Sequence, residues 1–314
     1  MEATMAKRTG KVAIIGAGFV GSTAAYALLI EGAASEITLI DRHLQKAEGE
    51  AMDLRHGLQF RADSRVTYGT SYSLCRDAEI IVVCAGAHQE KGETRLDLVK
   101  KNAAMFREMI PSIVKHNKDC ILVVVSNPVD ILTRLALTYS GFPASRVFGT
   151  GTMLDTARFR FLLGERFGVS PESVHAYILG EHGDSSFPVW STANIAGVPL
   201  RDFRQYDKRA MEGIYQQTKN AAYEVIARKG ATYYAIGLAV ARLVKAILSD
   251  QNMVFALSAL LKGYHGVNGI CLSVPCVVNR EGIKEQIVMP LNAEEKKKLK
   301  KSAGVIKNTF KGVS

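Results

Sequence analysis

The stretch Val12-Ala13-Ile14-Ile15-Gly16-Ala17-Gly18-Phe19-Val20-Gly21 decides the fold of this 314-residue chain. Its four apolar residues predict a short buried strand, and the glycines after them predict a tight turn that opens a helix. The glycines follow a G-x-G-x-x-G pattern, which is typical of the turn that receives the pyrophosphate of a dinucleotide. Gly16 permits the turn, Gly18 lets the backbone approach a phosphate, and Gly21 lets the helix pack on the strand.

An acidic residue stands where such a strand–turn–helix unit needs one. Asp41 ends the next apolar run, Ile37–Ile40, and lies 20 residues after Gly21. An acid at this place receives the hydroxyls of the adenosine ribose and repels a 2′-phosphate, which favours NAD over NADP. The alternative is that Asp41 only caps the helix that follows. Strand, glycines and acid in register favour the NAD site.

Apolar runs alternate with helical patterns through the first half of the chain. Strands are expected at Val12–Ile15, Ile37–Ile40, Arg65–Tyr68, Ile80–Cys84, Ile121–Val125 and Val147–Phe148, with helices near Val20–Glu31, Gln45–Leu58, Leu96–His116 and Pro128–Ser140. This order predicts an α/β fold, with a Rossmann-type doubly wound parallel sheet that is covered by helices on both faces. Ligands bind such sheets at the carboxyl ends of the strands.

The second half predicts a mixed α+β domain for substrate binding and catalysis. Helices are expected near Met153–Phe167, Asp202–Arg228 and Tyr233–Ser249, and strands around Val174–Leu179, Phe187–Ser191, Met253–Leu261 and Ile270–Val278. The last two alternate as antiparallel strands do. We place the domain boundary near Gly149, giving an NAD-binding domain at 1–149 and a second domain at 150–314. The helix near 233–249 is expected to pack back on the first domain.

Composition and charge exclude several classes of protein. The five cysteines are scattered without a C-x-x-C pair, which predicts a reduced, cytoplasmic protein with no metal site. The longest apolar runs are far too short to span a bilayer, and no secretion signal is apparent. The net charge of +10 suits nucleic acid or anionic metabolites equally. No basic and aromatic residues interleave as in RNA-binding proteins, so no nucleic-acid or membrane partner is expected.

The densest basic run lies near the end of the chain. Lysines dominate residues 296–301, after Asn292 and two glutamates. Leu299, Ala303, Ile306 and Phe310 recur at helical spacing. We therefore expect an amphipathic helix that is capped by Asn292, with the lysines on its solvated face.

Three polar segments carry the candidate chemistry. In Gly149–Arg160, Asp155 and Arg158 share one helix face, whereas Arg160 points to nearly the opposite side. His182 lies between glycines in Gly180-Glu181-His182-Gly183-Asp184-Ser185, at the end of an apolar strand.

The ordinary pKa of histidine suits proton transfer near neutrality, and an upstream Asp would make His182 half of an acid/base dyad. Taken alone, His182 would be structural as often as catalytic. The third segment, Gly86–Leu96, suits a mobile lid over the crevice or an ordinary exposed connection.

In these motifs the chain resembles the L-lactate dehydrogenase family, over essentially its whole length. The matching stretches are the glycine pattern, Leu39-Ile40-Asp41, the segment 86–96, Ser126-Asn127-Pro128-Val129-Asp130, Leu154–Arg160 and Gly180–Ser185. The resemblance implies an NAD-dependent enzyme that moves a hydride between (S)-lactate and pyruvate, in glycolysis and fermentation.

The resemblance also implies residue roles. His182 would be the acid/base, oriented by Asp155, and Arg158 would bind the substrate carboxylate through a bidentate fork. Arg95 would close with the lid and polarise the carbonyl. Other substrate contacts would come from Gln89, Asn127, Thr232 and Ile236. The implied cofactor contacts are Gly16, Gly18, Phe19, Val20, Gly21, Asp41, Ala85, Gly86, Ser126 and Asn127.

The nearest alternative is malate dehydrogenase, which shares the fold and the dyad. Its dianionic substrate needs a cation in the lid, and relatives of that kind carry Arg at the position of Gln89. A neutral Gln cannot pair a second carboxylate, so Gln89 favours pyruvate, although Lys91 could partly compensate. A different class remains, in which the fold is kept as a non-catalytic NAD-binding or structural protein.

Arg160 and His175 suggest a second, regulatory site. Bacterial relatives that fructose 1,6-bisphosphate activates carry an Arg and a His at these positions, at a two-fold subunit interface. The resemblance thus implies an allosteric homotetramer in which two such pairs clamp the bisphosphate. The alternative is that Arg160 makes a structural ion pair and His175 is an ordinary strand residue.

Overall fold

Six parallel strands form the sheet that the sequence predicts. The computed structural model describes residues 10–60, 64–87 and 95–312. The strands are β1 (Lys11–Ile15), β2 (Glu36–Ile40), β3 (Arg65–Gly69), β4 (Ile80–Val83), β5 (Ile121–Val124) and β6 (Val147–Gly149). They lie in the order β3-β2-β1-β4-β5-β6, which is that of a dinucleotide-binding Rossmann sheet. The predicted α/β fold class is confirmed.

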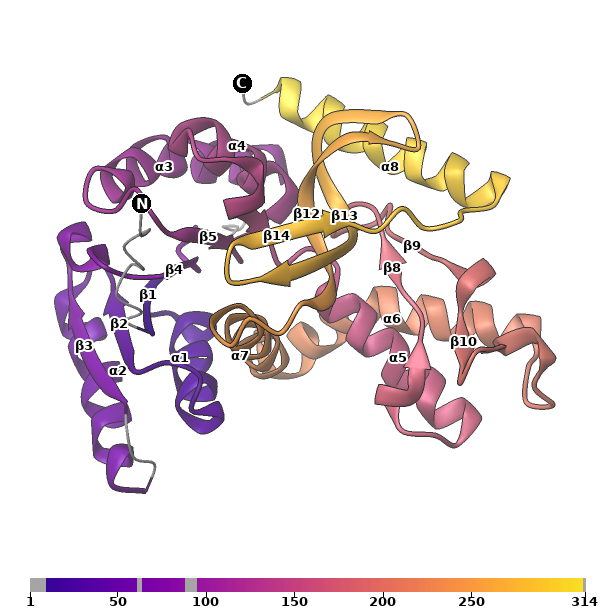
Figure 1. The fold of residues 1–314 in the computed structure, drawn as a ribbon, viewed down its shortest axis with the longest axis horizontal. Coiled ribbons are helices and arrows are strands. Elements are labelled where there is room, and N and C mark those ends of the chain that lie inside the picture. The colour runs from indigo at the N-terminus through magenta and orange to yellow at the C-terminus, as the bar shows by residue number, and fades with distance from the viewer. Residues whose placement is uncertain (1–9, 61–63, 88–94, 313–314) are drawn as a thin grey trace, which may run out of the picture.

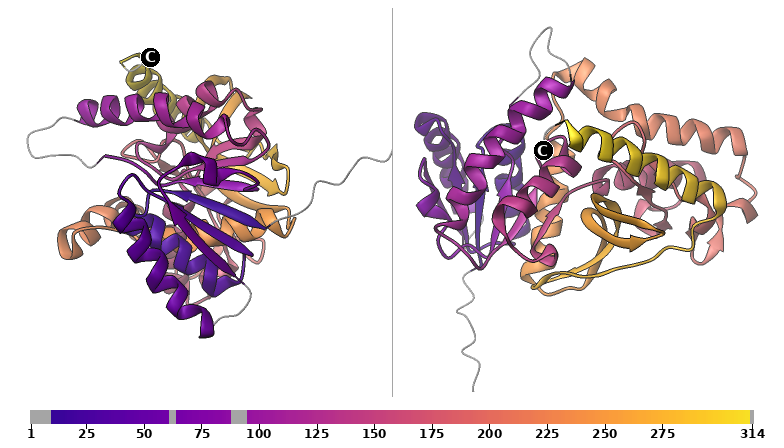
Figure 2. Two further views of the ribbon diagram at one scale, coloured as in Figure 1. Left: turned by 90° about the vertical axis from the view of Figure 1, so that its left-hand side faces the viewer. Right: turned by 90° about the horizontal axis from the view of Figure 1, so that it is seen from above.

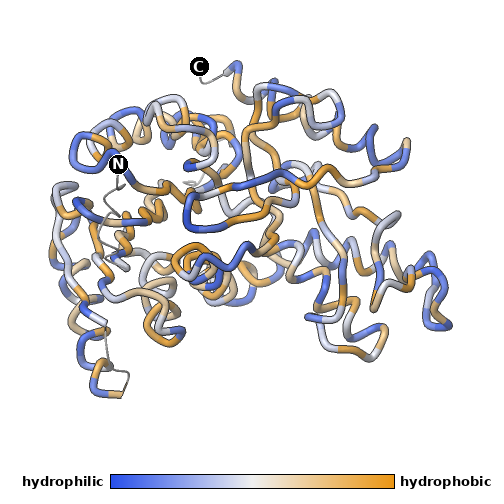
Figure 3. Tube along the Cα trace, in the orientation of Figure 1, coloured by the Kyte–Doolittle hydropathy of each residue, from blue (hydrophilic) through white to orange (hydrophobic). Residues whose placement is uncertain are grey.

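Helices cover both faces of this sheet, because β1, β4 and β5 are almost wholly apolar and buried. One face carries α1 (Phe19–Glu31), α2 (Leu44–His56) and α7 (Tyr234–Leu248), and the other carries α3 (Arg95–Val114) and α4 (Val129–Ser140) (Figures 1 and 2). Helix α7 packs against α1, so a helix from the second half of the chain lies on the N-terminal sheet. Apolar residues are concentrated in the strands and in α7 (Figure 3).

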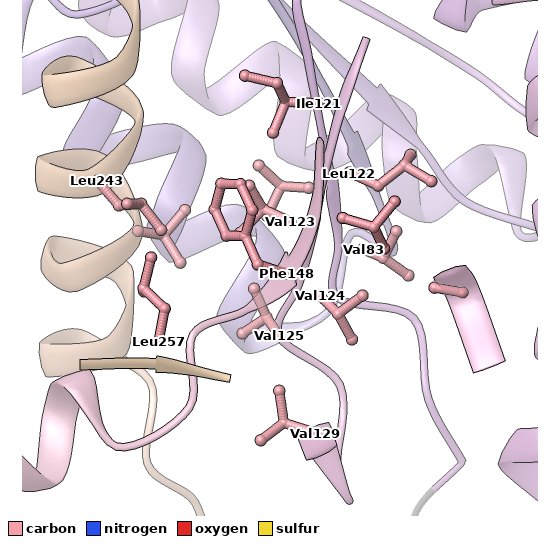
Figure 4. Packing of buried hydrophobic residues seen from close by; sticks show 14 of the residues in the cluster. Val83, Ile121, Leu122, Val123, Val124, Val125, Val129, Phe148, Leu243 and Leu257 are labelled. Carbon is pink, nitrogen blue, oxygen red and sulfur yellow. The ribbon is translucent and has the colours of Figure 1, made fainter. Parts of the chain in front are cut away.

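The sheet continues past the position where the sequence places a domain boundary. Strands β12 (Met253–Tyr264), β13 (Val267–Asn279) and β14 (Gly282–Gln286) add to β6 in antiparallel fashion and give nine strands. Leu257 of β12 and Leu243 of α7 pack near Phe148 of β6 (Figure 4). The two halves of the chain therefore share one hydrophobic core. The division into two domains stays a prediction.

The second half also contains α5 (Met153–Phe167), α6 (Lys208–Lys229) and five short strands. These are β7 (Val174–His175), β8 (Ile178–Leu179), β9 (Phe187–Pro188), β10 (Asn194–Ile195) and β11 (Val198–Pro199). Short 3-10 turns lie at η1 (Gly57–Phe60), η2 (Tyr72–Cys75), η3 (Ala144–Arg146), η4 (Pro171–Ser173), η5 (Trp190–Thr192) and η6 (Leu200–Asp202).

Three predicted elements of this half are wrong in extent. The expected strand Phe187–Ser191 ends at Pro188, because the chain turns into the 3-10 segment η5 from Trp190. The expected strand Val174–Leu179 is two strands, because β7 pairs with β10 whereas β8 pairs with β9 in a different sheet. The expected helix Asp202–Arg228 begins only at Lys208, where the side chain of Asp207 accepts a hydrogen bond from the Ala210 N–H.

The C-terminal helix forms as predicted. In α8 (Ala293–Lys311) the Asn292 side chain accepts the Glu295 N–H at 2.9 Å, and Glu295 accepts the Asn292 N–H at 3.0 Å. This reciprocal capping box begins the helix. Leu299, Ala303 and Ile306, on the apolar face of α8, are buried.

No helix within the described ranges is long and apolar enough to cross a membrane.

Candidate active site

The glycine turn between β1 and α1 is shaped as a close-packed cradle. Gly16 has φ +99°, and a Cβ there would stand 2.8 Å from the backbone nitrogen of Ala85. A Cβ on Gly21 would stand 1.9 Å from the carbonyl oxygen of Gly16. Side chains are therefore excluded at both positions, and β1, β4 and α1 meet at van der Waals distance.

The start of α1 fits the pyrophosphate of a dinucleotide. Gly18 caps the helix without a side-chain hydrogen bond, and the first turn holds no acidic residue. A Cβ on Gly18 would meet only the Nζ of Lys46, at 4.0 Å. The first-turn N–H groups and a nearby ammonium thus face open space, which suits an anionic group. Phe19 is 66% exposed and stacks on Tyr233, with 5.2 Å between ring centroids.

Asp41 closes the cradle at the end of β2. Its Oδ2 accepts the Ala17 N–H at 2.8 Å, and its Oδ1 accepts the His43 N–H at 3.0 Å. The second bond lies at the start of α2, so part of the capping role considered as an alternative is present. Each carboxylate oxygen retains a lone pair for a ribose hydroxyl.

A buried asparagine, which the sequence reasoning missed, joins the two loops beside the cradle. Asn102 of α3 accepts the Ala87 N–H through Oδ1 at 2.8 Å and donates through Nδ2 to the Asn127 carbonyl at 2.9 Å. Ser126 donates to the Ala85 carbonyl at 2.6 Å. The predicted cofactor residues Ala85, Ser126 and Asn127 therefore lie together. Gly86 belongs to the loop after β4, and a Cβ on it would stand 3.6 Å from the Cβ of Ser126.

The structure brings together His182 and Asp155, the predicted acid/base dyad, and Arg158, the predicted substrate-binding residue. His182 Nδ1 lies 2.6 Å from Asp155 Oδ2, and Arg158 Nη1 lies 3.1 Å from Asp155 Oδ1. Burial favours a neutral imidazole, but the charge and hydrogen bond of Asp155 prevail and raise the pKa of His182 above its usual value. Burial likewise opposes the ionisation of Asp155, yet His182 and Arg158 lower its pKa.

Buried hydroxyls fasten α5 against β8 and so determine where Asp155 lies. Thr152 Oγ1 donates to the Ile178 carbonyl at 2.5 Å, and Thr156 Oγ1 accepts the Ile178 N–H at 3.1 Å. Ser273 of β13 accepts the Thr152 N–H at 3.0 Å. Because His182 follows β8 by a few residues, these bonds hold the two halves of the dyad in register.

A cavity of about 220 Å³ opens beside the dyad. Asp155, His182 and Asn127 line it together with apolar residues of α3 and one face of α6. The α6 residues are Tyr215, Thr218, Lys219, Ala222, Tyr223 and Ile226. The sequence reasoning missed this wall, because nothing in the local pattern of α6 indicates which face meets His182. Thr232, Ile236 and Arg158 do not line this cavity.

Two predicted residues belong to the lid segment. Gln89 lies outside the described residues. Arg95 is the first residue of α3, but its side chain also lies outside them. Their predicted roles stay predictions.

The predicted regulatory pair lies away from the dyad. Arg160 donates to the Ala176 carbonyl at 2.9 Å and stacks over the Tyr177 ring at 4.7 Å. His175 is exposed on β7, in register with Asn194 of β10. Arg160 therefore leaves the face of α5 that carries Asp155 and Arg158. Among the described residues, no His, Cys, Asp and Glu cluster could hold a metal ion.

The class of protein that this geometry defines is the NAD-dependent oxidoreductase, since a dinucleotide cradle and an acid/base pair are built on one Rossmann sheet. Residues 10–149 match the NAD-binding domain of lactate/malate dehydrogenases, and residues 152–314 match the α/β C-terminal domain of the same enzymes. The chain belongs to the lactate/malate dehydrogenase family.

Relatives and solved structures agree with this assignment. The L-lactate dehydrogenase of Acetivibrio thermocellus is 49% identical over 306 residues, covering 96% of each chain. That of Geobacillus kaustophilus is 47% identical, over 96% of this chain and 97% of its own. The ligand-bound minor L-lactate dehydrogenase of Enterococcus mundtii superposes with a TM-score of 0.96 at 43% identity, over 98% and 99% of the two chains.

Proposed function

We propose that the chain is an L-lactate dehydrogenase that interconverts pyruvate and (S)-lactate, with His182 as the acid/base. The observation that carries the proposal is the 2.6 Å bond between His182 Nδ1 and Asp155. It occupies Nδ1 and leaves Nε2 for substrate, beside a cavity of about 220 Å³. The L-lactate dehydrogenases that match at 46–49% identity support this choice of substrate.

The residues of the chain have separate tasks in this reaction. NADH held by the glycine cradle and Asp41 would supply the hydride for reduction of the carbonyl carbon. The protonated His182 donates its Nε2 proton to the keto oxygen during reduction and removes it during oxidation. Asp155 holds the Nδ1–H tautomer and stabilises the imidazolium. Arg158 binds the substrate carboxylate by a bidentate fork.

The remaining tasks belong to residues around the dyad. Arg95 polarises the carbonyl and excludes water when the lid closes. Asn127 donates near the reacting oxygen. Thr232 and Ile236 shape the pocket around the nicotinamide.

Substrate choice follows from charge. A neutral Gln89 leaves the second carboxylate of oxaloacetate without a cation, which disfavours the malate dehydrogenase reaction. The intact dyad and glycine cradle argue against a non-catalytic NAD-binding protein.

The second part of the proposal is allosteric activation of a homotetramer by fructose 1,6-bisphosphate through Arg160 and His175. Exposed apolar side chains on the packed pair α1 and α7 support assembly, because Tyr26, Ile30 and Leu238 are each about half exposed. Identical pyruvate saturation curves with and without the bisphosphate, in dilute enzyme at physiological pH, would contradict it.

We further propose NAD-binding and catalytic domains at 1–149 and 150–314, in a cytoplasmic protein. The match of the two family domains to 10–149 and 152–314 supports the boundary. The five unpaired cysteines support a reducing compartment.

The deciding experiment measures NADH oxidation with pyruvate and with oxaloacetate, in the wild type and in His182→Asn. We expect kcat/KM to favour pyruvate strongly and the variant to lose turnover while it still binds NADH. Faster reduction of oxaloacetate would indicate malate dehydrogenase. No oxidation with any 2-keto acid would indicate the non-catalytic alternative.

A further inference from the structure

A second carboxylate, which the proposed mechanism does not use, holds the catalytic loop. Asp130 lies in the first turn of α4 and is 2% exposed. Its Oδ2 accepts the backbone N–H of His182 at 2.8 Å, and its Oδ1 accepts the Ser258 hydroxyl of β12 at 2.5 Å. Asp130 thus joins three elements at the residue that moves the proton.

The charge of Asp130, rather than its hydrogen bonds, needs an explanation. An asparagine could make the same two contacts, because its oxygen can accept the His182 N–H and its amide can donate to Ser258. It would do so without the desolvation cost of burying a carboxylate. Position in the first turn of α4 offsets part of that cost through the helix dipole. A buried charge beside an acid/base residue therefore suggests an electrostatic task.

In the part of the chain that the structure describes, both positively and negatively charged side chains lie near His182. From α5, Asp155 favours the protonated imidazole and Arg158 opposes it, and from α4, Asp130 favours it. Other charged groups nearby are Glu181 and Asp184 of its own loop and Lys219 of α6, which lines the same cavity. Asp155 and Asp130 are the two carboxylates whose charge raises the pKa of His182. Only Asp155 makes a hydrogen bond to the imidazole ring, whereas Asp130 accepts the backbone N–H of His182.

We propose that Asp130 is a positioning residue that fixes the backbone of the His182 loop and, through its charge, favours the protonated imidazole needed for pyruvate reduction. This inference rests on the proposed role of His182. Burial raises the pKa of Asp130 to about 6 against the opposing bonds from Ser258 and His182. The carboxylate is therefore mostly charged at neutral pH, and its support is lost as the pH falls below that value.

The test is Asp130→Asn, which retains both contacts and removes only the charge. Pyruvate reduction needs protonated His182, so kcat/KM for pyruvate falls as the pH rises through the histidine pKa. In the variant this fall begins at lower pH. On the alkaline side we expect kcat/KM for pyruvate to drop about three- to tenfold, the effect of removing one partly screened charge. At acid pH it stays unchanged.

Lactate oxidation gives a second profile, because it needs neutral His182 and its kcat/KM rises with pH through the histidine pKa. With cofactor affinities unchanged, the fixed overall equilibrium makes both directions change by the same factor at any one pH. In Asp130→Asn the kcat/KM for lactate should therefore also drop about three- to tenfold on the alkaline side, stay unchanged at acid pH and reach its plateau at lower pH. A purely structural Asp130 would lower both directions by one factor at every pH and leave both inflections in place, and that result would overturn the proposal, as would unchanged profiles.

Two serine variants complete the design. Ser258→Ala removes a donor to the charged form of Asp130, which raises the pKa of that carboxyl. We expect a smaller displacement of both profiles in the same directions. Ser273→Ala is the matched control, because it removes an uncharged buried contact to Thr152 and should lower turnover without displacing either profile.

If Asp130→Asn does not fold, as judged by circular dichroism, Ser258→Ala decides, and an undisplaced profile overturns the proposal. Failure of the proposed function itself would look different. His182→Asn would then retain its turnover, or the wild type would not reduce pyruvate.

Discussion

Replacing Asp155 by Asn tests how the dyad works, because either orientation of the new amide breaks one contact. With its oxygen toward His182, the amide NH₂ faces Arg158 Nη1, which is also a donor and lies 3.1 Å from the present Oδ1. With the oxygen toward Arg158, the NH₂ donates to His182 Nδ1 and enforces the wrong tautomer. In both cases the charge that stabilises the imidazolium is gone.

The magnitude follows from the bond that is lost. A hydrogen bond between charged groups contributes about 1.5–3 kcal/mol. At 1.36 kcal/mol for each tenfold change in rate, kcat should fall by about tenfold to 150-fold. Asp155 makes no contact with the glycine cradle among its hydrogen bonds, so the Kd for NADH should change by less than about twofold.

The assay compares steady-state kcat with NADH affinity, measured by fluorescence titration. Asp184→Asn is the control, since Asp184 is a carboxylate that lines the same cavity. Equal losses in kcat and NADH affinity, or an equal loss of kcat in Asp184→Asn, would refute the dyad reasoning.

Three further predictions test specificity, the cofactor cradle and stability. Gln89→Arg should shift the ratio of kcat/KM values at least tenfold toward oxaloacetate, and an unchanged ratio would contradict the charge-pairing argument. Gly21→Ala places a Cβ 1.9 Å from the Gly16 oxygen and should weaken NADH binding at least tenfold. Gly49→Ala, whose Cβ meets nothing within 4 Å, should leave binding intact. Asn292→Ala removes the cap of α8 and should lower the melting temperature by about 2 °C, from a cost of about 1 kcal/mol; an unchanged melting temperature would show that the cap contributes nothing.

Features that depend on neighbouring residues could be predicted from the sequence. The β1–α1 turn follows from three glycines within six positions, and the start of α8 follows from Asn292 and Glu295, three residues apart. In both cases sterics or a local hydrogen bond determine the backbone. Contacts across long loops could not be predicted in this way. The Glu181 N–H donates to Ser302 at 2.7 Å across 121 positions, and neither residue carries a local pattern that indicates the other.

The expected single strand at residues 174–179 is wrong because its two halves pair with different strands. Residues 174–179 read as one apolar run, but His175 pairs with Asn194 whereas Ile178 pairs with Pro188. Which neighbour each half meets depends on packing far along the chain. The same applies to the α6 wall of the cavity, where helical periodicity indicates an apolar face but not what it covers.

The central claim is that His182 carries the proton in pyruvate reduction, and its pH profile tests this most directly. Kcat/KM for pyruvate would be measured against pH in the wild type and in His182→Asn. Because Asp155 raises the pKa of His182, we predict that the wild type is active at low pH and loses activity through a single pKa above the usual value for histidine. His182→Asn should lose both the activity and the inflection. A variant that reduces pyruvate within about tenfold of the wild type, with the inflection intact, would contradict the account.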